Sequence, residues 1–113
     1  MYFLMNAAQR KARGGTLYLE FQPGLYRNKH WQDDSLFLPA PLFDDLGLFH
    51  LFVQAIPNFD YYYYTEVTAD QFRLLKALAQ EHHTQCAAGI LEELAPHAEK
   101  WLEACGCFTI CGI

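Results

Sequence analysis

Cysteine and histidine are the side chains in this sequence best suited to metal binding or catalysis. The sequence has four cysteines and five histidines, and the one cluster with metal-ligand residue types combines His82, His83, Cys86, Cys105, Cys107 and Cys111. Tetrahedral zinc needs four such donors, with cysteines usually paired in a tight knuckle. The Cys105-Gly-Cys107 spacing is shorter than in such a knuckle, and a strand through Cys105–Cys111 would spread its thiols along ~20 Å. We therefore predict no metal and no cofactor, with the cysteines reduced and packed as small apolar groups.

The sequence around these residues also lacks the usual setting of a catalytic nucleophile. A Cys–His pair needs a strained turn, or a helix N-terminus directed at the thiol, and no such feature is predicted here. The sequence contains no glycine-rich phosphate loop, no paired-carboxylate motif and no H-E-x-x-H motif. His50 is expected to be a hydrogen-bonded core histidine, and the His82–His83 pair is expected near a helix C-terminus. We predict no catalytic residues, and a small thiol- or metal-dependent enzyme is the least favoured alternative.

Four consecutive tyrosines, in the segment DYYYYTE over Asp60–Glu66, are the most unusual feature of the sequence. Alternate side chains of a strand point to opposite faces, so at most two of these rings can enter one core. The other two need a second covered face, the solvent or a partner. Tyrosine combines a large contact area with few rotatable bonds and is enriched among interface hot spots. One interpretation is a protein-binding surface; the other is a strand packed between helices, with its hydroxyl groups at the rim.

Charge is unevenly distributed along the chain. Residues 1–43 carry a net charge of +2, whereas residues 44–113 carry −7. This imbalance disfavours direct binding of nucleic acid and would attract a basic protein, although solubility alone is an alternative explanation. The predicted partner-binding residues are Asp44, Asp45, Asp60, Tyr61, Tyr62, Tyr63, Tyr64 and Glu66, with either Tyr62 and Tyr64 or Tyr61 and Tyr63 on the exposed face.

The first part of the chain is predicted to form strands after a short N-terminal helix over Tyr2–Ala12. Thr16–Gln22 alternates apolar and polar residues, which predicts a half-buried strand. Its buried face would carry Leu17, Leu19 and Phe21, and its solvent face Tyr18, Glu20 and Gln22. Leu25–Trp31 is expected to return as a partner strand. A turn at Asp33-Asp34 and a further strand over Ser35–Leu38 follow.

Residues 42–55 are predicted to form one helix, with a buried strand as the alternative. Apolar residues recur at helical spacing through this segment: Phe43, Leu46, Phe49, Phe52, Val53 and Ile56. Pro41 suits a first helical turn, and Pro57 is expected to end the helix.

The tyrosine segment is predicted to be a strand over Phe59–Val67 that leads directly into a helix. Thr68 and Gln71 form a capping-box pattern, and the apolar stripe after them extends to about His82.

A second helical stretch is expected from about Thr84, with a kink or restart at Pro96 and a stop at Gly106, followed by a C-terminal strand. These elements predict a single α+β domain over residues 1–113, with two layers: a mostly antiparallel sheet of about four to five strands packed by about three helices.

The longest apolar run, Leu46–Val53, is far shorter than the ~20 residues of a membrane span. The N-terminal basic residues follow the apolar patch rather than precede it, unlike a signal peptide, so we expect a cytoplasmic protein.

The segment from Ile56-Pro57 through FDYYYYTEVTADQF into FRLLKALA resembles the small immunity proteins of contact-dependent growth inhibition and related bacterial polymorphic toxin systems. Several of those proteins have an aromatic-rich strand, a T-E-hydrophobic-T step and an acidic/Gln-aromatic helix start, and the match covers about residues 42–82. The resemblance implies a non-enzymatic cytoplasmic protein that binds one toxin domain, often a nuclease, and blocks its active site or a neighbouring surface. The chain would act as a monomer or homodimer. The alternative is a structural or homo-oligomerising interaction protein.

Overall fold

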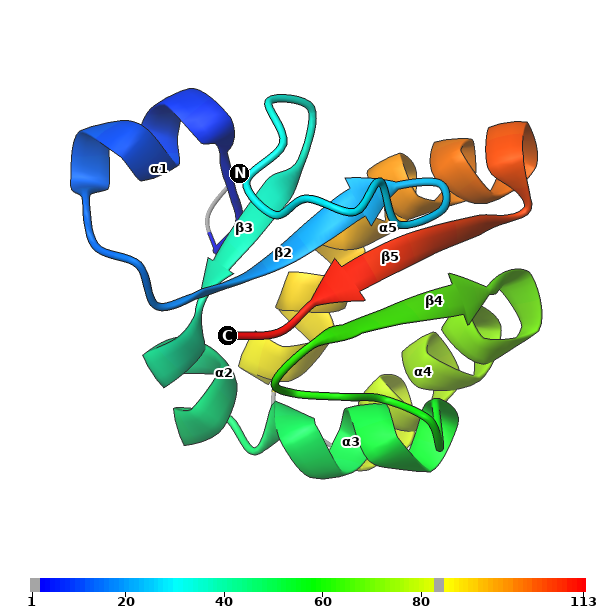
Figure 1. Ribbon diagram of the computed structural model, residues 1–113. Coiled ribbons are helices and arrows are strands. Elements are labelled where there is room, and N and C mark those ends of the chain that lie inside the picture. Colours follow the sequence, from blue (N-terminus) through cyan, green and yellow to red (C-terminus); the bar gives the residue numbers. More distant parts are fainter. Residues whose placement is uncertain (1–2, 83–84) are drawn as a thin grey trace.

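The computed structural model describes residues 3–82 and 85–113, and these residues form five strands and five helices. In chain order the elements are β1 (Met5–Asn6), α1 (Ala7–Arg13), β2 (Tyr18–Pro23), β3 (Leu36–Pro39), α2 (Ala40–Asp45), α3 (Leu48–Ala55), β4 (Tyr64–Thr68), α4 (Ala69–His82), α5 (Gln85–Cys105) and β5 (Cys107–Cys111). The strands form one sheet in the order β1-β3-β2-β5-β4, and every neighbouring pair is antiparallel (Figure 1). The predicted α+β domain with a mostly antiparallel sheet is confirmed.

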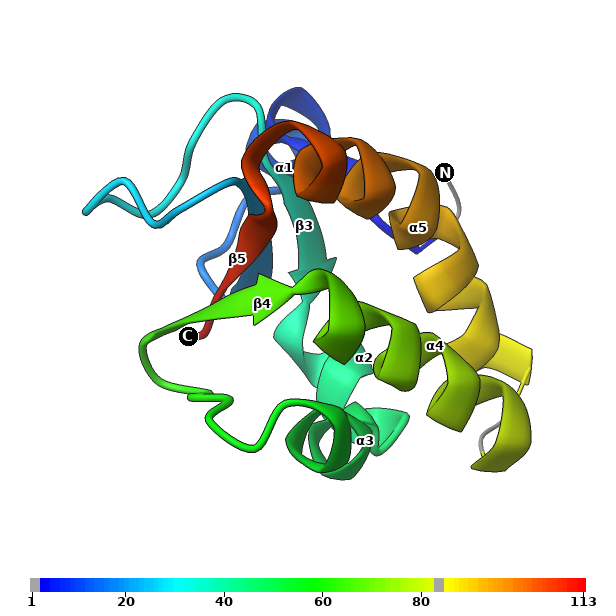
Figure 2. The same ribbon diagram turned by 90° about the vertical axis from the view of Figure 1, so that its right-hand side faces the viewer.

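One face of the sheet packs against α4 and α5 to form the main hydrophobic core (Figure 2). Leu19 and Phe21 of β2 lie beside Leu38 of β3 and Ile110 of β5 on this face, and all four are fully buried. Helix α3 packs against α4 and closes the core below β4. Alternation along the strands therefore buries one continuous apolar layer, as the pattern in Thr16–Gln22 predicted for Leu19 and Phe21.

The second face of the sheet is also covered, so the prediction that β2 is half-buried is wrong. Tyr18, Glu20 and Gln22, which were expected to face solvent, are only 5%, 3% and 0% exposed, whereas Leu17 is 57% exposed. Helix α1 and the connection between β2 and β3 lie on this side, opposite α4 and α5 (Figure 2). Ala7 of α1 contributes to a small second core there.

The connection between β2 and β3 is held over the sheet by the buried carboxylate of Glu20. Its oxygens accept hydrogen bonds from the backbone N–H groups of Trp31 and Gln32 at 2.7 and 2.8 Å and from the hydroxyl group of Ser35 at 2.6 Å. Leu25–Trp31 was predicted to be a strand, and this prediction is wrong. The segment is irregular because its backbone follows the Glu20 carboxylate, with Trp31 at φ 66°. The predicted turn at Asp33-Asp34 is present.

The segment predicted as one helix over residues 42–55 is helical but divided in two. Helix α2 begins earlier, at Ala40, and ends at Asp45, and α3 starts at Leu48. Gly47 separates them with φ 67°, a left-handed conformation that a regular helix cannot contain. The end of α3 before Pro57 agrees with the prediction.

The helix start after the tyrosines is confirmed in detail, but the strand before it is shorter than predicted. Thr68 Oγ1 accepts the N–H of Gln71 at 3.2 Å, and Gln71 Oε1 accepts the N–H of Thr68 at 3.0 Å. This capping box begins α4, which extends to His82. Strand β4 starts only at Tyr64, so Tyr61–Tyr63 form a turn instead of the predicted strand. His82 is the last residue of α4, which agrees with the helix C-terminus predicted for the His82–His83 pair, whereas His83 lies outside the described residues.

The two ends of the chain differ from the expectations mainly in element boundaries. The N-terminal helix was predicted over residues 2–12 and is observed as α1, starting with a capping box between Asn6 and Gln9. Helix α5 is described from Gln85, so the predicted start near Thr84 falls outside the described residues, and α5 continues through Pro96. Gly106, at φ 79°, follows its last residue, and β5 completes the sheet as predicted.

The turn of Tyr61–Tyr63 is fixed to the end of β5 by the backbone. The N–H of Gly112 donates to the carbonyl of Tyr63 at 2.7 Å, and the N–H of Ile113 donates to that of Tyr61 at 2.9 Å. A Cβ atom on Gly112 would lie 1.8 Å from the carbonyl oxygen of Tyr61, so the two segments can approach this closely only with glycine at that position.

We expect Gly112→Ala to lower the free energy of unfolding by about 2 kcal/mol or more, because the new methyl group overlaps a backbone atom. Urea denaturation of the purified variant measures this change. Gly15→Ala is the matched control: Gly15 has φ 84°, but a Cβ atom added there would have no other atom within 4 Å, so the control reports backbone strain alone, about 1 kcal/mol. A loss in Gly112→Ala no larger than in the control would contradict the close approach.

Candidate functional site

A surface hollow of about 360 Å³ lies where α2, α3 and the tyrosine turn meet, and it is lined by Asp44, Phe49, Tyr61 and Tyr62. Asp44 is near the end of α2, and Phe49 is in the first turn of α3. The break at Gly47 lets these two short helices bring both side chains to the tyrosine turn. We call the surface formed by these four residues and the adjacent Tyr63 the phenol–carboxylate surface.

Tyr61 anchors the turn to the protein. Its ring stacks on Phe43 with centroids 5.8 Å apart and meets the edge of Phe49 at 6.0 Å. Its hydroxyl group donates to the carboxylate of Asp44, with oxygen separations of 2.9 and 3.1 Å. Burial, the hydrogen bond to Asp44 and the charge of that carboxylate raise the pKa of Tyr61 to about 12. The phenol is therefore a fixed, neutral donor to Asp44 at physiological pH.

Tyr62 and Tyr63 are the exposed members of the tyrosine run, at 77% and 56% exposure. The carboxylate of Asp60 accepts the N–H of Tyr62 at 2.9 Å, and the N–H of Asp60 donates to Thr65 Oγ1 at 2.8 Å. These bonds give the turn a defined shape. The Tyr62 ring also lies 5.2 Å from Tyr61, edge to face. The two exposed phenols are thus held in position by the backbone while their rings remain available for contact.

Tyr64 and Glu66 lie on the other side of β4 and hold the loop between β2 and β3. Tyr64 stacks on Tyr26 with centroids 4.1 Å apart, and Glu66 accepts the N–H of Tyr26 at 3.1 Å. Tyr26 in turn meets the edge of Tyr63 at 6.2 Å. The four tyrosines therefore divide into two that are packed, Tyr61 and Tyr64, and two that are exposed.

Asp45 does not join the phenol–carboxylate surface. It follows Asp44 in the chain but lines a different hollow, together with Arg13, Pro41 and Leu42. In the part of the chain that the structure describes, none of the ion pairs includes Asp44, Asp45, Asp60 or Glu66. Of the predicted residues, the structure brings Asp44, Tyr61 and Tyr62 together at the hollow and places Asp60 at the base of their turn. Tyr63 follows in the turn, with its ring 4.6 Å from that of Tyr64, whereas Asp45 and Glu66 lie apart from the hollow.

The cysteines and histidines do not converge in the described structure. Across residues 3–82 and 85–113, no group of three or more His, Cys, Asp or Glu side chains is arranged to hold a metal ion. All four cysteines are free: Cys86 and Cys105 are exposed, Cys107 is half-buried and Cys111 is buried. Burial raises the pKa of the Cys111 thiol to about 12, which makes it a poor nucleophile.

His50 is exposed on α3, so its predicted place in the core is wrong. Of its neighbours in the chain, Phe49 lies at the surface and Leu51 lies in the core.

Two residues of the site were not predicted from the sequence. Phe49 belongs to the helical stripe that was assigned to the core, yet it is 40% exposed, because the separate helix that begins after Gly47 buries Leu48 and Leu51 instead. Tyr26 lies in a segment predicted to be a strand. The glycine between the two short helices was a usable signal for Phe49, whereas nothing local to Tyr26 predicts its contact with residues about forty positions away.

Comparison of the chain with protein-family models, with curated proteins and with solved structures found no significant match. None of the helices within the described residues combines the length and the apolar character that crossing a membrane requires.

The raised pKa of Tyr61 predicts a pH dependence of stability. An unfolded tyrosine loses its proton near pH 10, whereas folded Tyr61 keeps it to about pH 12. The contribution of Tyr61 is therefore complete below pH 10 and is lost as the pH rises toward 12. We expect Tyr61→Phe to show a smaller decrease in the free energy of unfolding above pH 10 than the unchanged protein, measured by urea denaturation across this range.

Phenolate absorbance provides the second readout for Tyr61. The titration step at the highest pH should be absent in Tyr61→Phe and should move to lower pH in Asp44→Asn, because the amide removes the negative charge beside the phenol. An unchanged titration curve in both variants would contradict the hydrogen bond between Tyr61 and Asp44.

Proposed function

We propose that this chain is an immunity protein of a bacterial polymorphic toxin system, which binds a basic toxin domain in the cytoplasm and occludes its active or adjacent surface. One observation carries the proposal: Tyr62 and Tyr63 are exposed, yet their turn is already fixed by Asp60 and by the backbone bonds to Gly112 and Ile113. A surface ordered before binding loses little conformational freedom when a partner arrives. The resemblance of residues 42–82 to immunity proteins supports the same class.

Charge favours a basic partner for the phenol–carboxylate surface. Asp44 lies in the hollow and Asp60 at the base of the turn, and neither is neutralised by an ion pair within the described residues. Lysine and arginine side chains that bind substrate phosphates in a nuclease would bind these carboxylates by the same charge-assisted hydrogen bonds. We expect the carboxylates to act mainly on the rate of association, because exposed charges raise the association rate constant more than they increase the affinity of the complex.

The exposed rings are expected to supply most of the binding free energy. A tyrosine ring that becomes buried at the centre of an interface typically acts as a hot spot. Tyr62 projects furthest into solvent and lies beside Phe49, which is itself 40% exposed, so the two form one aromatic area. The Tyr61 ring behind them is packed on Phe43 and provides a rigid support.

Calorimetric titration with the toxin domain encoded by the neighbouring gene tests the proposal. We expect Tyr62→Ala to weaken binding about 30-fold, equivalent to about 2 kcal/mol, because it removes a central anchor. Asp44→Asn should slow association and reduce its dependence on salt, which stopped-flow measurements detect. Leu74→Ala is the control, since Leu74 is 46% exposed on α4 outside this surface and should leave the Kd unchanged. Unaltered affinity in a combined Tyr62→Ala, Tyr63→Ala, Asp44→Asn variant would refute the site.

A homodimer joined through β4 is the second candidate function, because β4 lies at an edge of the sheet. Among the described strands it pairs only with β5, which leaves its other side able to accept a strand from a second copy. Sedimentation of the free chain at micromolar concentration distinguishes the two: a monomer agrees with toxin binding by one chain and excludes the homodimer.

A further inference from the structure

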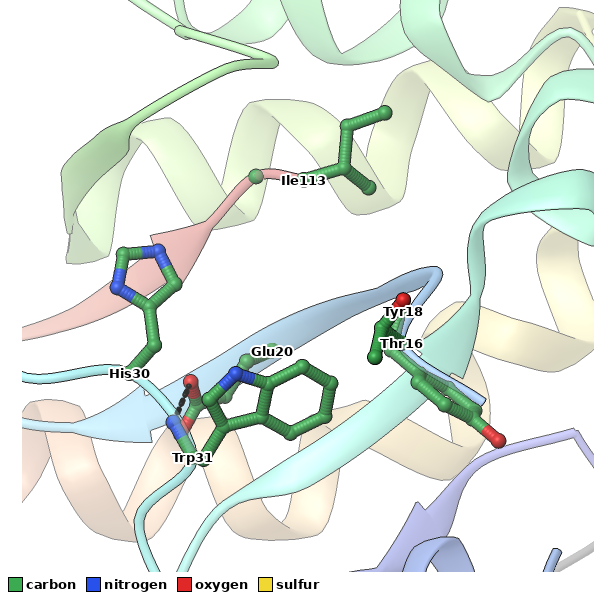
Figure 3. Close-up of a pocket in the computed structure, with 7 residues that line it drawn as sticks. Thr16, Tyr18, Glu20, His30, Trp31 and Ile113 are labelled. Carbon is green, nitrogen blue, oxygen red and sulfur yellow. Dashed lines mark hydrogen bonds between the residues drawn. The ribbon is translucent and has the colours of Figure 1, made fainter. Parts of the chain in front are cut away.

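A separate pocket of about 250 Å³ lies on the face of the sheet opposite α4 and α5. Its lining includes Tyr18, Glu20, His30, Trp31 and the last two residues, Gly112 and Ile113. In Figure 3, Trp31 lies between His30 and Tyr18, with Glu20 beneath it and Ile113 across the opening. The side chains of the phenol–carboxylate surface take no part in this lining, so the pocket is a second site, beyond the proposed function.

Glu20 gives the pocket a buried carboxylate that belongs to none of the ion pairs of the described residues. The side chain is 3% exposed. Within the same part of the chain, Oε2 accepts from Gln32 and Ser35, whereas Oε1 accepts only from the N–H of Trp31. A carboxylate oxygen has two lone pairs, so Oε1 can accept one further hydrogen bond. A buried carboxylate without a counter-charge is unfavourable, and a bound cation would offset this cost.

Aromatic rings beside Glu20 suit the same kind of ligand. Tyr18 and Trp31 meet edge to face with centroids 5.9 Å apart, and both line the pocket. The faces of such rings carry partial negative charge and attract cations. The protein itself already uses Trp31 in this way, because the guanidinium group of Arg10 lies 4.2 Å from the centre of its indole ring.

We infer that this pocket binds an organic cation, an alkylguanidinium or alkylammonium group, with its charged head at Oε1 of Glu20 and its apolar stem against Trp31 and Tyr18. A guanidinium or ammonium group brings only hydrogen-bond donors, which complement the free lone pair of Oε1. An anion would be repelled by Glu20, and a neutral ligand would leave the buried carboxylate without a counter-charge. The cation could be a free small molecule or a lysine or arginine side chain of a polypeptide, since both present the same chemistry.

Calorimetric titration with n-butylguanidinium tests the inference without any toxin domain, so its outcome is independent of the proposed function. We expect a Kd of about 1 mM or tighter for a ligand of this size. The neutral isostere N-butylurea should bind at least tenfold more weakly. Equal binding of both compounds, or no binding of n-butylguanidinium, would overturn the inference. An alanine-rich pentapeptide with one central arginine distinguishes a polypeptide side chain from a free cation as the source.

Two variants place the cation within the pocket. Glu20→Gln preserves the shape of the side chain and should weaken binding of n-butylguanidinium at least tenfold. Because this change also affects the bonds to the β2–β3 connection, Thr16→Trp provides an independent test: Thr16 is an exposed residue of the lining and makes none of the Glu20 hydrogen bonds, so a bulky ring there should block entry. Leu74→Trp adds the same ring at an exposed position of α4 outside the lining and should bind like the unchanged protein. Full binding by Thr16→Trp would show that the cation binds elsewhere and would overturn the inference.

Discussion

A single buried carboxylate, that of Glu20, organises the face of the sheet opposite α4 and α5. Its three hydrogen bonds hold the connection between β2 and β3 over the strands, and that connection carries both Trp31 and Tyr26. Tyr26 then packs on Tyr64 and Tyr63, so the tyrosine turn is supported from this side as well. A buried carboxylate is costly unless its oxygens are bonded, and the irregular path of the loop supplies those bonds. The loop conformation and the position of the tyrosines thus depend on the same contact.

The four consecutive tyrosines show how identical side chains take different roles when their neighbours differ. Tyr61 is packed because α2 brings Phe43 and Asp44 against it and α3 brings Phe49. Tyr64 is packed because Tyr26 stacks on it. Tyr62 and Tyr63 remain exposed because the chain turns between these two anchors. A continuous strand would have divided the rings by simple alternation; in the turn, each exposed ring instead contacts a packed one, Tyr62 against Tyr61 and Tyr63 against Tyr64.

Local signals in the sequence were sufficient for the fold class, for the start of α4 and for the end of α5. The capping box of Thr68 and Gln71 and the stop at Gly106 each depend on residues within one helical turn, and both are found where they were predicted. The covered second face could not be predicted in this way, because Glu20 becomes buried only when residues eleven to fifteen positions away fold over it. The same limit applies to the site: Phe49 has the spacing of a core residue, and only the tertiary arrangement turns it outward.

The backbone contact between the end of β5 and the tyrosine turn has a practical consequence for labelled forms of this protein. The N–H of Ile113 donates to the carbonyl of Tyr61 at 2.9 Å, so a tag or fluorophore attached at Ile113 would lie beside the tyrosine turn and compete with large ligands for the same space. At the other end of the described chain, the N–H groups of Phe3 and Leu4 donate to Glu93 on α5, on the far side of the sheet (Figure 2). Immobilisation through an N-terminal extension would therefore leave both proposed binding sites unobstructed.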